Sequence, residues 1–542
     1  MTGQSVRMLR ISHASLLLVV SLAAAAACSA NSGDSKVIEG AGASGGAGAS
    51  GGAGGFIPIG GSDAGPDKDR VVVIGPGADA SSPDKFGGEP VGAAPQVVYP
   101  EDGIVAPPNM NSLELHFIPG PGQTLFELTF ESSNLTFVVY VGCTPVGSGC
   151  VYQPDPNFWD RLADGARGRE PVIYSVRGVD GASPGTVGQS EPRELSFTEE
   201  DIVGGLYYWD DGGRIQRYDF GFALANAELY MTPQQAGAGV CVGCHVMSPN
   251  GRKMVVGKDI PAPAPYTVFD VASRQPVQGT GGPVAGSANF FTFSPDSNQL
   301  LYSNGVSIGW RDATSGNVVN PQVVDNGTMP DWSSDGSLLV YARTSQPPII
   351  AQPGIAGGSL EVRPFQNGGF GAATTLVQSQ GENNYYPTFS PDSQWVLFNR
   401  SASNTNSFSN TVDGELWVVS RNGGNPIRLT AASAPGWCSW PKWAPGVHTK
   451  DGRPVMYFTF SSARAYGLRP AGTTQLWMTA FEPGKAGDPG YPAFRLPFQD
   501  PTTGNHIAQW VAEIVRRPCT GPGECDSGEE CKDGVCVPPN VK

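Results

Sequence analysis

Short apolar runs alternate with turn residues along most of the chain, a pattern that indicates β-strands rather than helices. Between residues 95 and 199 such runs follow one another roughly every ten residues, and they read VVYP, SLELHFI, LFELTFE, LTFVVYVG, PVIYSVRGV and RELSFT. Short strands at this spacing are typical of two antiparallel sheets packed face to face. We therefore predict a β-sandwich over residues 95–199, a segment in which no catalytic constellation is visible.

A longer phrase repeats along residues 200–510. Each copy joins an apolar strand to a turn of the Ser-Pro-Asp type and then to a second apolar strand, and the equivalent positions are Ser248, Ser294, Ser333, Ser390 and Ala444. These positions lie 39 to 57 residues apart, which is about the length of one four-stranded propeller blade. A further strand pair at 205–220 adds another unit. The repeats predict a β-propeller with six or seven blades.

The repeats are similar to those of a known family. FSPD from Phe293, FSPD from Phe389 and ELWVVSRNGGNPIRLT over 415–430 resemble TolB-type β-propeller repeats, and the resemblance covers roughly residues 200–500. The preceding segment resembles immunoglobulin and fibronectin domains. The predicted fold class is all-β: an immunoglobulin/fibronectin-like sandwich, a TolB-like propeller and a short disulfide-rich tail over 511–542. Because propellers act as scaffolds, binders and enzymes alike, this fold implies little about activity.

The first 27 residues have the polarity of an export signal. Arg7 and Arg10 precede an apolar run over 16–27, and Cys28 follows directly. The sequence AAAC that ends at Cys28 resembles a bacterial lipobox, which implies lipidation of Cys28 and anchoring at the outer membrane or cell surface. The alternative is an ordinary secretory signal, which leaves Cys28 unmodified and the protein periplasmic. Residues 28–94 are rich in Gly, Ala, Ser and Pro, so we predict a disordered tether there.

The charge of the chain narrows the choice of partners. It carries 34 Lys and Arg against 49 Asp and Glu, a formal net charge of −15. Such an acidic protein repels phosphate backbones and anionic lipid, so we expect no nucleic-acid binding and no membrane contact beyond the lipid anchor. Neither an H-E-x-x-H sequence nor a credible Ser-His-Asp set is present. We therefore expect no hydrolase, whereas a redox protein stays open.

One motif carries specific chemistry. Cys241-Val242-Gly243-Cys244-His245 is C-x-x-C-H, the attachment motif of c-type haem. Two thiols at this spacing add to the two vinyl groups of one haem, and the adjacent His245 would bind the iron as its metal ligand. His506, which follows the last legible blade, is the candidate for the distal ligand. The motif predicts covalent haem c at the propeller.

Two functions follow from the motif, depending on whether the haem is present. The first is a surface-anchored c-type haem-binding propeller that takes part in electron transfer or redox sensing with a redox partner. The second is a non-enzymatic propeller lipoprotein that binds protein or glycan partners, with Cys241 and Cys244 joined as a structural disulfide. The sequence alone leaves both open.

The remaining cysteines predict structural disulfides in an exported protein. Cys143 and Cys150 bracket a short excursion between two strands, so we expect them to pair. We expect four more cysteines to form two disulfides within the tail, namely Cys519, Cys525, Cys531 and Cys536. Four cysteines can pair in three ways, and the sequence does not choose among them. Cys438 is left single, and its aromatic neighbours predict a buried thiol.

Overall fold

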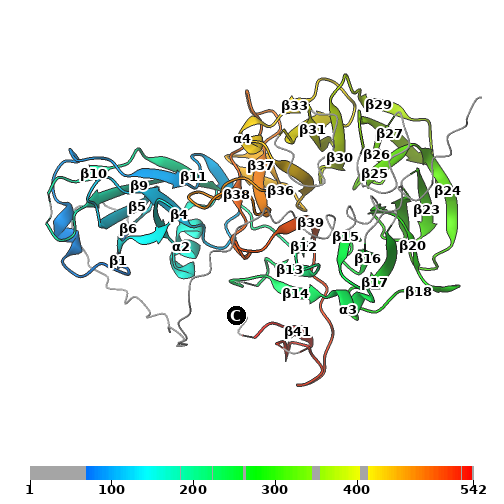
Figure 1. Cartoon of the computed structure of the whole chain (residues 1–542), viewed down its shortest axis with the longest axis horizontal. Helices are drawn as coiled ribbons and strands as arrows, with labels where there is room; N and C mark the ends of the chain where they lie inside the picture. The colour runs from blue at the N-terminus through cyan, green and yellow to red at the C-terminus, as the bar shows by residue number, and fades with distance from the viewer. Residues whose placement is uncertain are drawn as a thin grey trace, which may run out of the picture.

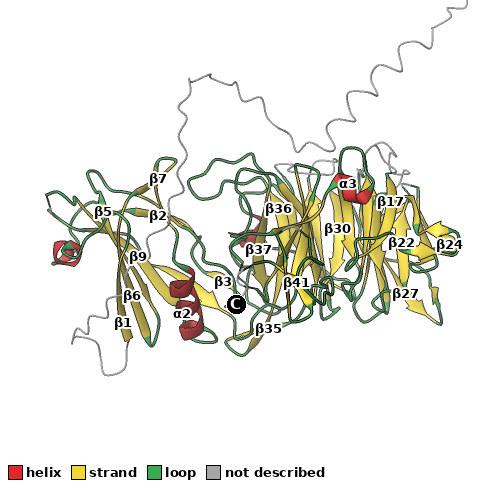
Figure 2. Ribbon diagram, turned by 90° about the horizontal axis from the view of Figure 1, so that it is seen from below, coloured by secondary structure: helices red, strands yellow, loops and turns green. Residues whose placement is uncertain are grey.

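The computed structural model describes residues 69–539 except 184, 223, 260–263, 305, 345–354, 403–412 and 527. The predictions for the signal peptide, Cys28 and the first part of the tether therefore lie outside the described residues. Figures 1 and 2 show two bodies side by side: a smaller sandwich formed by the N-terminal part of the chain and a ring of sheets formed by the rest. Nearly all of the regular structure is β, as the apolar pattern predicts.

The N-terminal body is a two-sheet sandwich, as predicted. Its larger sheet has the order β1 (Asp69–Ile74), β6 (Leu135–Gly142), β5 (Leu125–Glu131), β9 (Val172–Val179), β11 (Arg193–Phe197) and β3 (Ile104–Ala106), with β10 (Gly188–Gln189) paired to β9. The smaller sheet has the order β2 (Gln96–Tyr99), β4 (Leu115–Ile118), β8 (Gly149–Tyr152) and β7 (Thr144–Val146). Their facing side chains form the core of the sandwich.

The predicted limit of the tether at residue 94 is wrong for the part that the structure describes. Strand β1 pairs in parallel with β6 along its whole length, and the 3-10 helix η1 (Ser82–Phe86) follows it. Phe86 is buried, and its ring lies 5.6 Å from that of Tyr140. The run DRVVVI supplies enough apolar surface to add an edge strand, although Gly- and Pro-rich residues surround it. The sandwich therefore begins at Asp69.

The sandwich also contains a helix that the strand pattern did not reveal. Helix α2 (Pro156–Ala166) begins at Asp155, whose carboxylate accepts hydrogen bonds from the N–H groups of Asn157 and Phe158. Its buried side chains recur every three or four residues, namely Phe158, Trp159, Leu162, Ala163 and Ala166. This spacing places one apolar face against the sheets.

The second body is a propeller of six sheets in the described part of the chain, which agrees with the predicted six or seven blades. Blade 1 consists of β15 (Val242–Met247), β16 (Lys253–Lys258), β17 (Pro265–Asp270) and β20 (Ala285–Ser287). Blade 2 consists of β21 (Phe290–Phe293), β22 (Gln299–Ser303), β23 (Ser307–Asp312) and β24 (Val318–Asp325). Blade 3 consists of β25 (Gly327–Trp332), β26 (Leu338–Arg343), β27 (Ser359–Gln366) and β29 (Thr374–Val377).

Blades 4 and 5 continue the ring, and blade 6 closes it. Blade 4 consists of β30 (Asn383–Phe389), β31 (Trp395–Ser401), β32 (Glu415–Ser420) and β33 (Ile427–Arg428). Blade 5 consists of β34 (Cys438–Trp443), β36 (Arg453–Ser462), β37 (Gln475–Phe481) and β38 (Phe494–Arg495). Blade 6 consists of β39 (Asn505–Val511), β12 (Gly205–Asp210), β13 (Ile215–Asp219) and β14 (Glu228–Met231). The first strand of each set lies innermost, around the axis of the ring (Figure 1).

Several short strands and helices are attached to the blades. They are β28 (Gly369–Phe370), which pairs with β27, β35 (His448–Lys450), which pairs with β36, the hairpin β18 (Gln278–Gly279) and β19 (Gly282–Pro283), and the helices α3 (Pro233–Ala236) and α4 (Thr430–Ser433). After β39 the tail adds one further hairpin, β40 (Glu530–Lys532) and β41 (Val535–Val537).

The repeated Ser-Pro-Asp phrase is a hydrogen-bonded turn between the two innermost strands of a blade. In blade 2 the Oγ of Ser294 donates to Asp296 and accepts from the N–H of Gln299 at 2.9 Å. The same pair of contacts recurs in blade 3 at Ser333 and in blade 4 at Ser390. A local side chain that satisfies backbone donors explains why this phrase recurs once per blade.

The ring closes by pairing strands from the two ends of the propeller. Strand β39 comes from the C-terminal end and pairs antiparallel with β12 from the N-terminal end, with Leu206 opposite Trp510 and Trp209 opposite His506. His506 therefore lies where the chain returns to blade 1, as the sequence predicts. Ring closure depends on contacts between residues nearly the whole propeller apart.

The sandwich packs against the edge of blades 5 and 6 and shares a hydrophobic core cluster with them. At this interface His116 is fully buried, and its Nδ1 accepts a hydrogen bond from the N–H of Leu468 while its Nε2 lies 2.7 Å from Glu114. The hydroxyl of Tyr99 accepts from the N–H of Arg495. Such polar contacts within a continuous core fix the orientation of the two bodies.

Among the described residues, no helix combines the length and the apolar character that crossing a membrane requires.

Candidate functional site

The inner strands are irregular at one equivalent position around the ring. Five residues there have positive φ angles: Cys244 (46°), Met329 (54°), Tyr386 (50°), Trp440 (51°) and Ile507 (57°). The pairing register shifts next to each of them, so each inner strand carries a β-bulge. Positive φ is uncommon for residues with side chains, and bulges re-aim the side chains around them. The sixth inner strand, β21, places Phe290 at this position without a bulge.

These bulges surround one end of the central channel, which we call the aromatic end and define by Cys244, Phe290, Met329, Tyr386 and Trp440. They line a cavity of about 60 Å³. The rings of Tyr386 and Trp440 stack with centroids 4.1 Å apart, and the ring of Phe290 lies 5.7 Å from Trp440 and 6.1 Å from Tyr386. Three aromatic rings from blades 2, 4 and 5 therefore form one cluster.

A charged pair lies deeper in the channel, two residues beyond the bulges. Nζ of Lys442 in blade 5 lies 2.7 Å from Oδ1 of Asp331 in blade 3. The other oxygen of Asp331 accepts from the N–H of Phe389 at 2.8 Å and from the hydroxyl of Thr388 at 3.2 Å. Asp331 is buried, so these contacts compensate the removal of its charge from water.

The opposite end of the channel opens among the Ser-Pro-Asp turns, and we call it the turn end. Its cavity has a volume of about 340 Å³ and shares Asp331, Thr388 and Lys442 with the aromatic end. Large side chains one residue further along the inner strands form its wall, namely Met247, Phe293, Trp332, Phe389, Trp443 and Trp510. The charged pair therefore lies between two rings of aromatic and apolar side chains.

The loop before the C-x-x-C-H motif is held by one carboxylate. Asp259, after strand β16, accepts hydrogen bonds from the N–H groups of Gly239, Val240 and Cys241 at 2.6, 2.7 and 3.0 Å. Burial acts to raise the pKa of Asp259, but the three donors outweigh it and lower that pKa. Asp259 thus fixes the backbone at Cys241.

The interpretation of Cys241 and Cys244 as a disulfide with each other is wrong. Cys244 is a free, half-buried thiol, so it is not joined to Cys241. The physical reason is the bulge in β15: Cys244 lies within it, with a φ of 46°, whereas Cys241 lies before the strand, beside Gly213. Cys244 instead reaches the aromatic end of the channel.

The two candidate haem ligands are buried in the wall of the ring. His245 has no exposed surface, and its Nε2 lies 3.2 Å from the carbonyl oxygen of Tyr207 in blade 6. Burial lowers the pKa of His245 to about 4 and that of His506 to about 3. The ring of His506 packs edge-on to Trp440 and Trp209. Both imidazoles are therefore neutral parts of the seam between blades 1 and 6.

The motif as folded here does not fit a haem. His245 lines the aromatic end, but His506 is not among the described residues that line either cavity of the channel. The cavity beside Cys244 and His245 measures about 60 Å³, whereas cofactor sites span roughly 300–1,000 Å³. We therefore derive no step through a haem.

The predicted disulfides of the sandwich and the tail and the predicted buried thiol are confirmed. Cys143 and Cys150 form a disulfide across the β7–β8 hairpin, and in the tail Cys519 pairs with Cys531 and Cys525 with Cys536. The structure thus selects one of the three pairings that sequence permits. Cys438 is a fully buried thiol, as predicted, and its sulfur accepts a hydrogen bond from Arg464 at 2.9 Å.

Sequence reasoning missed the channel residues. A signal for them was present: three inner strands carry a bulky residue followed by proline just before the repeated phrase, namely Met329-Pro330, Tyr386-Pro387 and Trp440-Pro441. The residue after each proline is Asp331, Thr388 or Lys442, the polar group in the channel. Aligning the blades on these prolines predicts the ring, although not which members of it pair.

No family model matches the chain, and no curated relative matches it either. Solved propeller structures are similar to it. They include a protein assigned as TolB from Agrobacterium tumefaciens (16% identity, 55% of this chain and 89% of that one, TM-score 0.33) and the propeller domain of the Trilobed protease from Pyrococcus furiosus (12%, 58% and 80%, 0.26). A third is the Dos1 propeller (10%, 61% and 82%, 0.30). These likenesses concern the fold alone. By its own sheets the described chain is a six-bladed β-propeller fused to a β-sandwich.

Proposed function

We propose that this protein is an exported, surface-anchored propeller that binds a protein partner at the aromatic end of its channel. The observation that carries the proposal is the cluster of Phe290, Trp440 and Tyr386 beside the Asp331–Lys442 pair. Rigid aromatic side chains contribute most of the binding energy at many protein interfaces. Trp440 is only half-buried, so part of the cluster is open to a partner.

The size of the cavity favours a protein partner over a free small molecule or a glycan. About 60 Å³ accommodates one inserted side chain, whereas small-molecule sites need several hundred Å³. A partner that inserts one side chain gains the rest of its affinity from the rim, as interfaces with a central anchor and a surrounding contact area do. We expect the inserted group to be apolar or aromatic, because it meets stacked rings before it meets the charged pair.

The disulfides support the extracytoplasmic location. Three disulfides join described cysteines in the sandwich and the tail, and such bonds persist in oxidising compartments. Together with the export signal and the lipobox-like sequence, they support an outer-membrane or cell-surface protein anchored through Cys28. Loss of membrane partitioning in Cys28→Ser tests the anchor.

Selection of peptides from a display library against the full chain tests the binding site. Selected peptides should bind Trp440→Ala at least about 30-fold more weakly, the loss expected for a central aromatic anchor. Ile427→Ala, which changes an exposed residue on the outermost strand of blade 4, is the matched control and should bind normally. Equal binding to wild type and Trp440→Ala would exclude the aromatic end as the site.

Covalent haem, with electron transfer or redox sensing, stays a prediction and is the second candidate function. It rests on the C-x-x-C-H motif of the sequence alone, because the cavity beside Cys244 and His245 is smaller than a cofactor site. A reduced pyridine haemochrome spectrum, recorded after expression in a host that matures c-type cytochromes, decides it. A c-type α-band that survives denaturation and is absent from Cys241→Ala/Cys244→Ala would establish the haem. A colourless protein leaves the binding function.

A further inference from the structure

The Cys-rich tail returns to the blade that closes the ring. It follows β39, the inner strand of blade 6, and in Figure 1 its hairpin β40–β41 lies beside β13, β14 and α3. Strands β13 and β14 come from the opposite end of the propeller sequence. The tail therefore contacts the second chain segment that contributes to the same blade.

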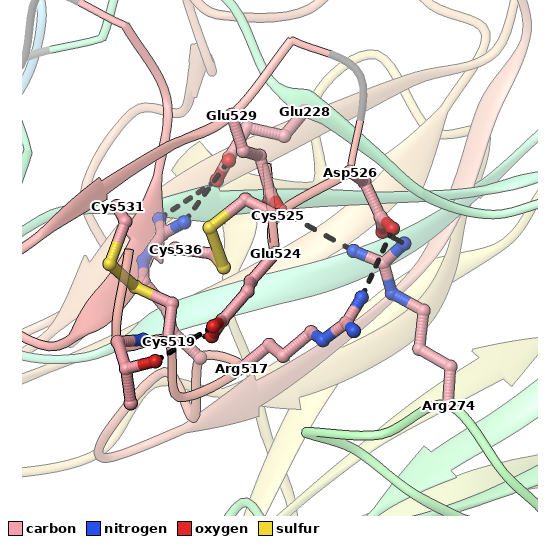
Figure 3. The surroundings of a disulfide bond; sticks show 12 residues. Glu228, Arg274, Arg517, Cys519, Glu524, Cys525, Asp526, Glu529, Cys531 and Cys536 are labelled. Atoms are coloured by element: carbon pink, nitrogen blue, oxygen red, sulfur yellow. Dashed lines mark hydrogen bonds and ion pairs between the residues drawn. A yellow bond between two sulfur atoms is a disulfide. The ribbon is translucent and has the colours of Figure 1, made fainter. Parts of the chain in front are cut away.

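The disulfides give the tail its shape. Cys519–Cys531 and Cys525–Cys536 staple a segment in which few side chains are buried, and Cys531 and Cys536 face one another across the hairpin. So short a segment has no hydrophobic core of its own, and only covalent links hold it folded. As Figure 3 shows, the stapled loop presents Asp526 and Glu529 toward arginines of the propeller.

Those two carboxylates complete a buried ionic cluster. Glu529 lies 3.3 Å from Arg217 of β13 and 4.0 Å from Arg274, and Asp526 contacts Arg274 and Arg517 at 2.5 and 3.4 Å. The guanidinium of Arg217 is only 4% exposed, and its charge is also compensated by Glu228 at 3.0 Å.

Charges are balanced across the whole cluster. Arg516, which is 5% exposed, contacts Glu228 and Asp219 at 2.9 and 3.1 Å. Four guanidinium groups thus face four carboxylates, two of which the tail supplies: Arg217, Arg274, Arg516 and Arg517, with Asp219, Glu228, Asp526 and Glu529. Removing the tail carboxylates would take from Arg274, which is 17% exposed, both of its carboxylate contacts and would leave Arg217 with Glu228 alone, which is destabilising.

We propose that the tail is a redox-sensitive latch on the closure of the propeller. A dithiol reductant transfers two electrons and two protons to each tail disulfide, which yields four thiols and converts each reductant dithiol to a disulfide. The reduced tail loses its hairpin, Asp526 and Glu529 leave the arginines, and the ladder between β12 and β39 opens more often. A disulfide oxidant that takes two electrons and two protons from each pair of tail thiols, and is itself reduced to a dithiol, restores the latch, so the redox state of the surroundings sets how firmly the ring is closed.

Hydrogen exchange on the full chain tests this proposal. We expect the amides of β12 and β39 to exchange at least tenfold faster in Cys519→Ser/Cys525→Ser/Cys531→Ser/Cys536→Ser, while those of blades 2 to 4 stay unchanged. The matched control is Cys143→Ser/Cys150→Ser, which removes the sandwich disulfide and should affect only its own hairpin. Unchanged exchange at β12 and β39, or an equal increase in every blade, would overturn the proposal.

A second pair of variants separates the ionic contacts from the disulfides. Asp526→Asn/Glu529→Gln keeps both disulfides and should also speed exchange at β12 and β39, by at least threefold. Glu524→Gln removes a tail carboxylate that contacts only Thr520 within the tail, so it should leave both strands unchanged. If Asp526→Asn/Glu529→Gln behaves like Glu524→Gln, the tail does not act through these carboxylates and the latch is refuted.

Discussion

Lys442 and Asp331 meet inside the channel with Nζ 2.7 Å from Oδ1, although their inner strands belong to blades 5 and 3. Blade 4 lies between them and contributes Thr388, whose hydroxyl donates to the same carboxylate. The pair thus links three blades across the channel. Contacts of this kind arise only when repeats that are distant in sequence close into a ring.

Replacing Lys442 should show how much the stability of the protein depends on the ion pair with the buried carboxylate of Asp331. Lys442→Met leaves Asp331 with two neutral donors, and we expect the free energy of unfolding to fall by about 1–3 kcal/mol, because Lys442 is itself partly exposed. In the double variant Asp331→Asn/Lys442→Met much of this loss should return. Chemical denaturation of wild type, Lys442→Met, Asp331→Asn and the double variant gives the coupling energy. A stability of Lys442→Met equal to wild type would show that the pair is fully screened by water.

Glu114 should make the interface between the sandwich and the propeller acid-sensitive. Burial acts to raise its pKa, but His116 and Arg469 outweigh burial and lower the pKa from 4.5 to about 2. A carboxylate whose pKa is lower in the folded state than in the unfolded state contributes stability that is complete above pH 4.5 and is lost as the pH falls toward 2. A shift of this size corresponds to about 3 kcal/mol. Glu114→Gln should therefore be less stable than wild type at pH 6, and the difference should shrink toward zero near pH 2. A constant difference over this range would contradict the assignment.

Cysteine mapping should separate the two states of the C-x-x-C-H motif. Without reduction, alkylation in denaturant should label Cys244 and Cys438 but none of Cys143, Cys150, Cys519, Cys525, Cys531 and Cys536. In the native protein, burial raises the pKa of the Cys244 thiol to about 11, so its alkylation should accelerate about tenfold per pH unit between pH 7 and 9. Peptide mass spectrometry measures both. A haem mass on the peptide that contains Cys241 and Cys244 would contradict the free thiol.

Asp259 should hold the loop that precedes Cys241. Asp259→Ala removes the acceptor of three backbone hydrogen bonds in an exposed loop, and we expect a loss of about 1–2 kcal/mol. The amides of Gly239, Val240 and Cys241 should exchange faster, while those of β15 change little. Ser273→Ala, which removes a hydroxyl from another exposed turn of blade 1, is the control and should leave the three amides unchanged. Equal protection in both variants would show that the loop is held by other contacts.

Much of the fold could be predicted from the sequence because it depends on contacts between residues that are close together in the chain. The Ser-Pro-Asp phrase marks each blade because its serine and aspartate hydrogen-bond within the turn itself. The disulfide of Cys143 and Cys150 was likewise predictable, since the two residues bracket a single hairpin. Strand β1 was missed because its apolar run is short and surrounded by a Gly-rich segment, and α2 because a single helix interrupts a series of strands.

The candidate site was less predictable, because its residues are brought together only by the ring. Sequence reasoning favoured Cys241, Cys244, His245 and His506, which carry recognisable chemistry. The structure buries His245 and His506 in the wall between blades, and Cys244 lines the cavity beside the stacked aromatic rings. A bulge decides which way such a side chain points, and a motif alone does not contain that information.

By itself, then, the sequence determined the strand content, the order of the two bodies, the number of blades to within one and the cysteines that form disulfides with near neighbours. Each of these depends on contacts within one turn, one hairpin or one repeat. Only the tertiary structure decided the pairing within the tail, the bond between Lys442 and Asp331 and the closure of blade 6 by β12 and β39. The tail pairing depends on how one short segment folds on itself, which three pairings would permit. The other two contacts join residues whose distance in space is set by the closure of the whole ring, and no local preference of the chain encodes that distance.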